Sequence, residues 1–140
     1  MAHSFFTSLR LKLWSGNIIA ALNTGSGKTL ISLLLIKWTI AKERSKGKVI
    51  IFLVPKVTLV EQQSLYIDKN TPDSIRVMKI HGALDINLGD RAGWKKRFEG
   101  HEVFVMTGSL LFALFIERRP HMTLHSSDLP QYIDTFSVEY

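Results

Sequence analysis

The stretch Leu22-Asn23-Thr24-Gly25-Ser26-Gly27-Lys28-Thr29 decides the fold of this chain. An apolar run of strand length, residues 17–22, comes before it, and an apolar segment of helix length, residues 30–42, follows it. A glycine-rich turn between a strand and a helix is typical of a loop that binds nucleotide phosphates. Gly25 and Gly27 let the backbone turn sharply and direct amides at the phosphates, and the helix N-terminus adds a positive dipole end. The alternative, a glycine turn followed by a chance Lys-Thr pair, explains this context less well.

Two side chains at the end of the loop have the chemistry that a nucleotide site needs. The Lys28 ammonium can reach the β and γ phosphates, and the Thr29 hydroxyl can ligate magnesium. The sequence therefore predicts ATP and Mg²⁺ as ligands, bound by Asn23, Thr24, Gly25, Ser26, Gly27, Lys28 and Thr29, with Thr29 as the metal ligand.

Apolar runs of strand length alternate with helix-length segments through the middle of the chain. That alternation predicts an α/β fold in which helices cover a parallel sheet. The first helix is apolar almost all round, which indicates burial against the sheet. A Pro-centred turn is expected at residues 70–73, and no element is predicted after Phe115 because no period of 2 or 3.6 persists there. The expected strands are residues 17–22, 49–54, 74–80 and 102–106, and the expected helices are residues 30–42, 58–68 and 91–98.

Length and composition place limits on the kind of protein. The 140 residues suffice for one domain, and 46% hydrophobic and 21% charged residues are ordinary for a soluble globular chain. Because there is no cysteine, disulfides and thiolate sites are excluded, and an intracellular compartment is expected. The longest apolar stretch, Leu30 to Ile36, is too short to span a membrane. A formal charge of +6 favours a polyanionic partner such as nucleic acid, although a merely basic surface fits equally well.

The loop departs from the strict phosphate-loop pattern at one position, since Leu22 stands where that pattern has glycine. Superfamily 2 helicases use a variant loop that ends in Thr-Gly-x-Gly-Lys-Thr, and residues 22–29 closely resemble the loop of Dicer and the related double-stranded-RNA sensor helicases. Downstream, Phe52-Leu53-Val54-Pro55-Lys56 followed by Val60-Glu61-Gln62-Gln63 is similar to motif Ia of that group, which touches the nucleic-acid backbone. The resemblance covers residues 17–111.

Two further segments resemble helicase motifs. His81-Gly82-Ala83 is similar to the Ser/His-Gly turn of motif Ib, and residues 103–107 are similar to the strand-ending motif whose threonine meets a phosphate. The resemblance implies a RecA-like P-loop NTPase sheet, Mg-ATP as ligand, and nucleic acid, in particular double-stranded RNA, as partner. It implies nucleic-acid contacts at Pro55, Lys56, Gln62, Gln63, His81, Gly82 and Thr107.

Several of these residues also have a purely structural explanation. Thr58 with Glu61 three residues later matches a capping box at a helix start. Gln62 and Gln63 could equally belong to an ordinary surface helix, and His81 could be a polar turn residue. A basic cluster around Trp94 could extend a binding surface, but a solvated helix face is the favoured explanation for Arg91, Lys95, Lys96 and Arg97.

The resemblance stops at both ends of the chain. Hydrolysis in this family needs an apolar strand that ends in Asp-Glu, which hold magnesium and orient the attacking water. The acids that follow Thr107 are isolated from one another: Glu117, Asp128, Asp134 and Glu139. Residues 1–16 contain no glutamine that could form the adenine-reading Q motif. We therefore expect an incomplete domain, with a divergent segment at 1–16, a partial ATP-binding domain at 17–114 and an irregular, divergent tail at 115–140.

Two functions fit these observations. The first is the ATP-binding part of a Dicer-like ATP-dependent RNA helicase, and the second is a hydrolysis-dead remnant of a truncated gene product that binds nucleotide or nucleic acid. A P-loop phosphotransferase is a weaker third. Arg118-Arg119 could imitate its arginine-bearing lid, but Leu22 and the Gln62-Gln63 pair argue against it.

Overall fold

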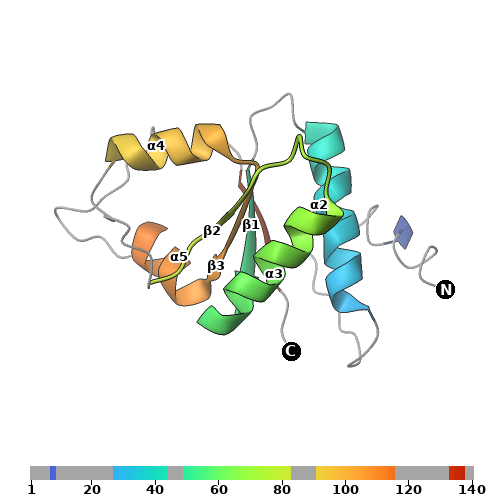
Figure 1. The fold of residues 1–140 in the computed structure, drawn as a ribbon, viewed down its shortest axis with the longest axis horizontal. Coiled ribbons are helices and arrows are strands. Elements are labelled where there is room, and N and C mark those ends of the chain that lie inside the picture. The colour runs from blue at the N-terminus through green and yellow to red at the C-terminus, as the bar shows by residue number, and fades with distance from the viewer. Residues whose placement is uncertain (1–6, 9–26, 44–48, 83–90, 116–132, 138–140) are drawn as a thin grey trace.

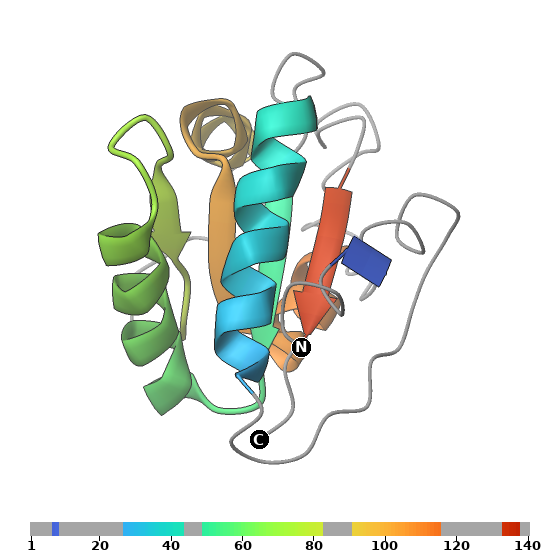
Figure 2. The same cartoon turned by 90° about the vertical axis from the view of Figure 1, so that its right-hand side faces the viewer.

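Helices cover both faces of a four-stranded parallel sheet. The computed structural model describes residues 7–8, 27–43, 49–82, 91–115 and 133–137. The strand order is β2-β3-β1-β4, with β1 at Val49–Val54, β2 at Val77–Lys79, β3 at Val103–Thr107 and β4 at Ile133–Ser137. The helices are α2 at Lys28–Glu43, α3 at Val57–Asn70, α4 at Arg91–Gly100 and α5 at Gly108–Phe115. Figures 1 and 2 show α2 and α3 on one face of the sheet and α4 and α5 on the other.

The two faces hold separate hydrophobic clusters because successive residues of a strand point to opposite sides. On the first face, Ile50 and Phe52 of β1 pack with Leu33 and Ile36 of α2 and with Val60 of α3. On the second face lie Val49, Ile51, Phe104 and Met106 of the strands with Trp94 and Phe98 of α4 and Leu114 of α5. Burial on both faces explains why β1 and β3 are continuous apolar runs. The predicted α/β fold with a helix-covered parallel sheet is confirmed.

The strands end at a common edge. Val54, the last residue of β1, is in register with Thr107, the last residue of β3. On the other side of β1, Leu53 is in register with Ser137 at the end of β4. Figure 2 shows that α2 and α3 both begin at the edge where β1 and β4 end. This carboxyl edge therefore collects the strand ends and two helix N-termini.

Most expected elements in the described ranges are found, with shifted ends. The third expected strand is shorter than 74–80, because Ile75 N–H donates to Pro72 O (2.8 Å) in the expected Pro-centred turn. Arg76 N–H then donates to the Glu102 side chain (2.7 Å), so only Val77–Lys79 form the strand. The first expected strand, residues 17–22, lies outside the described residues.

The capping-box prediction is wrong. The N-cap residue of α3 is Lys56, which makes no side-chain capping hydrogen bond, and Thr58 lies inside the first turn. Glu61 pairs instead with Lys79 and His81 on the neighbouring strand segment. The helix begins two residues earlier than the box requires, and Glu61 contacts residues of another segment instead of the start of its own helix.

The segment after Phe115 contains a strand that the sequence does not predict. Residues 133–137, with the sequence Ile-Asp-Thr-Phe-Ser, form β4 parallel to β1. Five residues of mixed polarity carry too little periodicity to indicate a strand. They form a strand because they pair with the apolar β1. Among the described residues, no helix combines the length and apolarity needed to cross a membrane.

Candidate functional site

The described part of the phosphate loop begins at Gly27. Its φ is 81°, the only positive φ among the described glycines, and the Ile31 N–H donates to the Gly27 carbonyl at 2.9 Å. Gly27 is thus the residue from which α2 starts, and its backbone adopts a conformation that side chains disfavour. Among the described residues, apart from the chain neighbours of Gly27 and its own helix, no atom lies within 4 Å of the position that a Cβ would take. Asn23, Thr24, Gly25 and Ser26 lie outside the described residues.

Lys28 and Thr29 are the first two residues of α2 and are half-buried. The first turn contains no acidic residue, and the Ser32 hydroxyl donates to the Lys28 carbonyl at 2.9 Å within the helix. A left-handed glycine beside open space, a positive helix end, a lysine and a hydroxyl fit the phosphates of Mg-ATP. Bound magnesium would neutralise charge on the phosphates.

The predicted nucleic-acid residues come together at the carboxyl edge, but they differ in exposure. Pro55 and Lys56, which follow β1, and Gly82, which follows β2, are exposed. His81 is largely covered. The parallel register places the segments after β1, β2 and β3 at one edge, because Val54 is paired with Thr107 and Lys79 with Val105. The surface of this edge therefore contains the exposed backbone at Pro55 and Gly82 and the ammonium group of Lys56.

The N-terminus of α3 adds backbone donors to this edge. Lys56 is its N-cap in extended conformation (φ −134°, ψ 145°), and the Lys56 side chain makes no capping hydrogen bond. That turn also lacks an acidic residue. The first N–H groups of a helix have no partner within the helix, and the dipole favours an anion there. Beside the exposed Lys56, these amides suit a phosphate group.

Two residues of the predicted set have structural surroundings that the sequence did not indicate. Gln63 is 4% exposed and faces the core, and its Oε1 has no hydrogen-bond partner among the described residues, whereas Gln62 is exposed. Thr107 is buried, and its Oγ1 lies 3.1 Å from Ser109 Oγ and accepts from the Leu110 N–H at 3.4 Å, which caps α5. Gln62 is thus the glutamine of the pair that is exposed to solvent.

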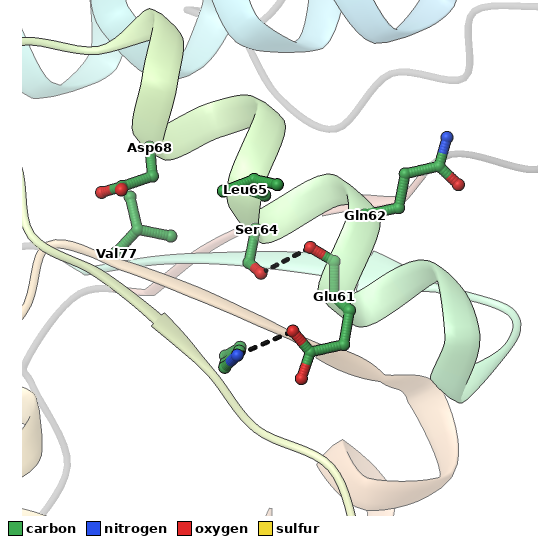
Figure 3. Close-up of a pocket in the computed structure, with 7 residues that line it drawn as sticks. Glu61, Gln62, Ser64, Leu65, Asp68 and Val77 are labelled. Atoms are coloured by element: carbon green, nitrogen blue, oxygen red, sulfur yellow. Dashed lines mark hydrogen bonds and ion pairs between the residues drawn. The ribbon is translucent and has the colours of Figure 1, made fainter.

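A cluster of charges links α3 to the end of β2. The Lys79 ammonium donates to Glu61 Oε2 at 2.7 Å, and His81 Nε2 lies 3.1 Å from Glu61 Oε1. The hydrogen bond from Lys79, with that of His81 next, lowers the pKa of Glu61 below its ordinary value of 4.5. Glu61 and Lys79 also line a groove of about 430 Å³ between α3 and β2, shown in Figure 3 with Gln62, Ser64, Leu65, Asp68 and Val77. No local pattern could have indicated Lys79, because its partner is on another element.

The lowered pKa of Glu61 predicts a pH dependence of stability. A carboxyl group whose pKa is lower in the folded chain stabilises it above the unfolded pKa, and this contribution disappears as the pH falls through the folded value. We therefore expect the unfolding free energies of the wild type and Glu61→Gln to differ at pH 7 and to converge below pH 4.5. Urea denaturation at pH 7, 5 and 3 measures this difference. A gap that stays constant down to pH 3 would contradict the lowered pKa.

The basic residues around Trp94 do not form a stacking platform. Trp94 is fully buried and packs against Phe98, with ring centroids 5.9 Å apart. The Arg97 guanidinium lies over the Trp94 ring at 5.2 Å, while Lys95 and Lys96 are exposed. The favoured explanation, a solvated helix face, agrees with this arrangement for the two lysines. The indole is unavailable to a nucleic-acid base.

Comparisons with known proteins agree with the resemblance of the motifs. The family model described as DEAD/DEAH box helicase matches residues 8–129. Dicer-like protein 1 of Neurospora crassa is 41% identical over 101 residues, which are 68% of this chain and 6% of that protein. Dicer-like protein 1 of Aspergillus niger is 40% identical over the same shares of each chain. Endoribonuclease Dicer homolog 2b of Oryza sativa subsp. japonica is 37% identical over 98 residues, 69% of this chain and 7% of that protein. The chain spans only 6 to 7% of the length of these relatives.

Proposed function

This chain belongs to the DEAD/DEAH box helicase family, and from that premise we propose that it is the ATP-binding part of a Dicer-like ATP-dependent RNA helicase. The observation that carries the proposal is the left-handed Gly27 directly before Lys28 and Thr29 at the start of α2. In this proposal, the 23–29 loop binds Mg-ATP, and the carboxyl edge binds the backbone of nucleic acid, in particular double-stranded RNA.

In nucleotide binding, backbone amides and two side chains have different tasks. The backbone amides of the loop and of the first turn of α2 surround the phosphates, and Lys28 offsets their charge. The Thr29 hydroxyl would ligate magnesium, which would supply positive charge beside the phosphates. No described atom beyond its chain neighbours and its own helix crowds the Cβ position of Gly27, which supports a close approach of a phosphate to this backbone.

The nucleic-acid surface uses contacts that carry no base specificity. Lys56, the amides at the N-terminus of α3, Gln62 and the His81–Gly82 turn all lie near strand ends at the carboxyl edge. Backbone N–H groups, the side-chain amide of Gln62 and the ammonium group of Lys56 are donors of the kind that bind phosphate and sugar oxygens. The proposed partner is therefore a nucleic-acid backbone, read by its charge and shape.

One sequence observation favours a second function, binding without hydrolysis. The acids of residues 115–140, Glu117, Asp128, Asp134 and Glu139, are isolated, so this stretch has no Asp-Glu pair that could orient an attacking water. In that case the chain holds nucleotide and nucleic acid but leaves the γ-phosphate in place.

One experiment tests the proposal and separates the two functions. A fluorescent ATP analogue is titrated into the 140-residue chain with and without Mg²⁺, and phosphate release is followed with and without double-stranded RNA. Magnesium-dependent binding with RNA-stimulated release supports a helicase ATPase, and binding without release supports the second function. No binding of nucleotide at any Mg²⁺ concentration would overturn both.

Lys56 gives a prediction for the nucleic-acid surface. Each phosphate contact releases condensed counterions, so removing one contact changes the slope of log K against log salt by about 0.7 to 0.9. Lys56→Ala is expected to lower the slope for double-stranded RNA by that amount, measured by fluorescence anisotropy between 50 and 200 mM salt, a range suited to such contacts. The matched control is Lys69→Ala, in the last turn of the same helix. Equal slope changes in the two variants would show that only net charge matters.

A further inference from the structure

Glu61 makes two contacts across the boundary between α3 and β2. Its Oε2 accepts from Lys79, the last residue of β2, at 2.7 Å, and its Oε1 lies 3.1 Å from Nε2 of His81. Each carboxylate oxygen thus has its own partner. Figure 3 shows the Glu61 side chain reaching from α3 toward the neighbouring strand, while Gln62 extends away from it.

The residues around His81 are fixed from two sides. Ile80 is 1% exposed, and its N–H donates to the Val105 carbonyl at 2.8 Å, which holds the backbone against β3. The His81 side chain is 10% exposed, and its buried Nδ1 has no hydrogen-bond partner among the described residues. The contact with Glu61 is therefore the one hydrogen bond recorded for this ring in the described part of the chain. Removing it leaves a covered ring without a polar partner, which is costly where a side chain is buried.

Next along the chain, Gly82 is exposed, and no atom of the described residues other than its chain neighbours lies within 4 Å of the position that a Cβ would take. The contact between Glu61 and His81 therefore sets where an open, accessible backbone segment lies relative to α3. We propose that Glu61 is a positioning residue for nucleic-acid backbone binding: it holds the His81–Gly82 turn against α3, so that the turn and the exposed face at Gln62 form one surface. This inference rests on the proposed function, because that function makes this surface a binding site.

Charge alone leads to the opposite expectation. Glu61 is an acid beside a surface proposed to bind phosphates, and its side chain is 53% exposed. Removing an acid from such a surface raises the local positive potential and strengthens binding of a polyanion. A positioning role predicts weaker binding, so the sign of the effect distinguishes the two.

The test compares three variants of the full 140-residue chain for binding of one defined RNA duplex. Glu61→Ala removes both contacts and is expected to weaken binding about three- to tenfold, in the range found for coupled neighbours. Glu61→Gln keeps an oxygen for Lys79 and offers an N–H to the His81 ring without the charge, so we expect binding at least as tight as in the wild type. Asp68→Ala, also exposed on α3 and lining the same groove, removes a charge alone and is expected to leave binding equal or tighter.

Two outcomes of the binding test overturn the inference. If Glu61→Ala binds the duplex as tightly as Glu61→Gln or Asp68→Ala, Glu61 acts only through its charge, and the proposed function stands. If the wild type binds no duplex, the proposed nucleic-acid function fails and the positioning role fails with it.

A second readout does not depend on RNA. Hydrogen exchange of the Ile80 to Gly82 amides is expected to be faster in Glu61→Ala than in the wild type, and close to wild type in Glu61→Gln. Unchanged exchange in Glu61→Ala shows that Glu61 does not hold the turn, and overturns the inference even where RNA binding is intact.

Discussion

Lys28→Ala is expected to weaken binding of Mg-ATP about 10- to 100-fold. A hydrogen bond to a charged group contributes about 1.5 to 3 kcal/mol, and each 1.4 kcal/mol is a factor of about ten in affinity. Lys28 is the first residue of α2, directly after the left-handed Gly27, so its loss leaves the helix and the glycine turn in place. Titration with a fluorescent ATP analogue measures the affinity, and circular dichroism checks that the fold is retained.

Lys37→Ala is the matched control for this experiment. Lys37 lies further along the same helix and is half-buried, as Lys28 is. Its removal changes the net charge equally but leaves the N-terminus of α2 intact, so affinity should stay within about twofold. A Lys28 variant that binds nucleotide as well as the Lys37 variant would contradict the proposed ATP site.

Trp94→Ala is expected to destabilise the chain by about 3 to 5 kcal/mol, the usual cost of removing a large buried aromatic side chain. Trp94 is fully buried between α4 and the sheet and packs against Phe98. The ring centroids of Phe98 and of Phe104 in β3 are 5.1 Å apart. Domains of ordinary size have only about 5 to 15 kcal/mol of stability in total. Urea denaturation followed by circular dichroism should show a large drop in the midpoint or an unfolded variant.

Lys95→Ala is the control that separates the loss of a buried side chain from the loss of an exposed side chain on the same helix. Lys95 is the next residue of α4 and is exposed, so its removal should change the unfolding free energy by less than about 0.5 kcal/mol. Similarly small effects of both variants would contradict a core role for Trp94.

The sequence predicted the elements whose own residues carry a strong pattern. Residues 49–54 and 103–106 are apolar throughout and form β1 and most of β3, and the long apolar segment after the loop forms α2. Since parallel strands end at one edge, the motif residues that follow them could be expected to meet there. The structure has Pro55, Lys56 and Thr107 at that edge.

What the sequence could not indicate depends on contacts between distant residues. The partner of Glu61 was expected within its own helix, yet Lys79 and His81 bind it from another segment. The same limit applies to β4, whose five residues form a strand only beside β1. Gln62 and Gln63 are adjacent and identical in type, but only the orientation of α3 decides that one is exposed and the other buried.

The hydrophobic cluster under α2 and α3 has a mechanical consequence. Leu33 and Ile36 of the helix that starts at the proposed ATP site pack in the same cluster as Val60 and Ile67 of the helix that starts at the proposed RNA edge, with Phe52 of β1 among them. Close-packed interiors compress little and transmit displacement. If nucleotide binding displaced the first helix, this shared hydrophobic cluster would pass the displacement on to the second helix, and the two proposed ligands would then be coupled through the core.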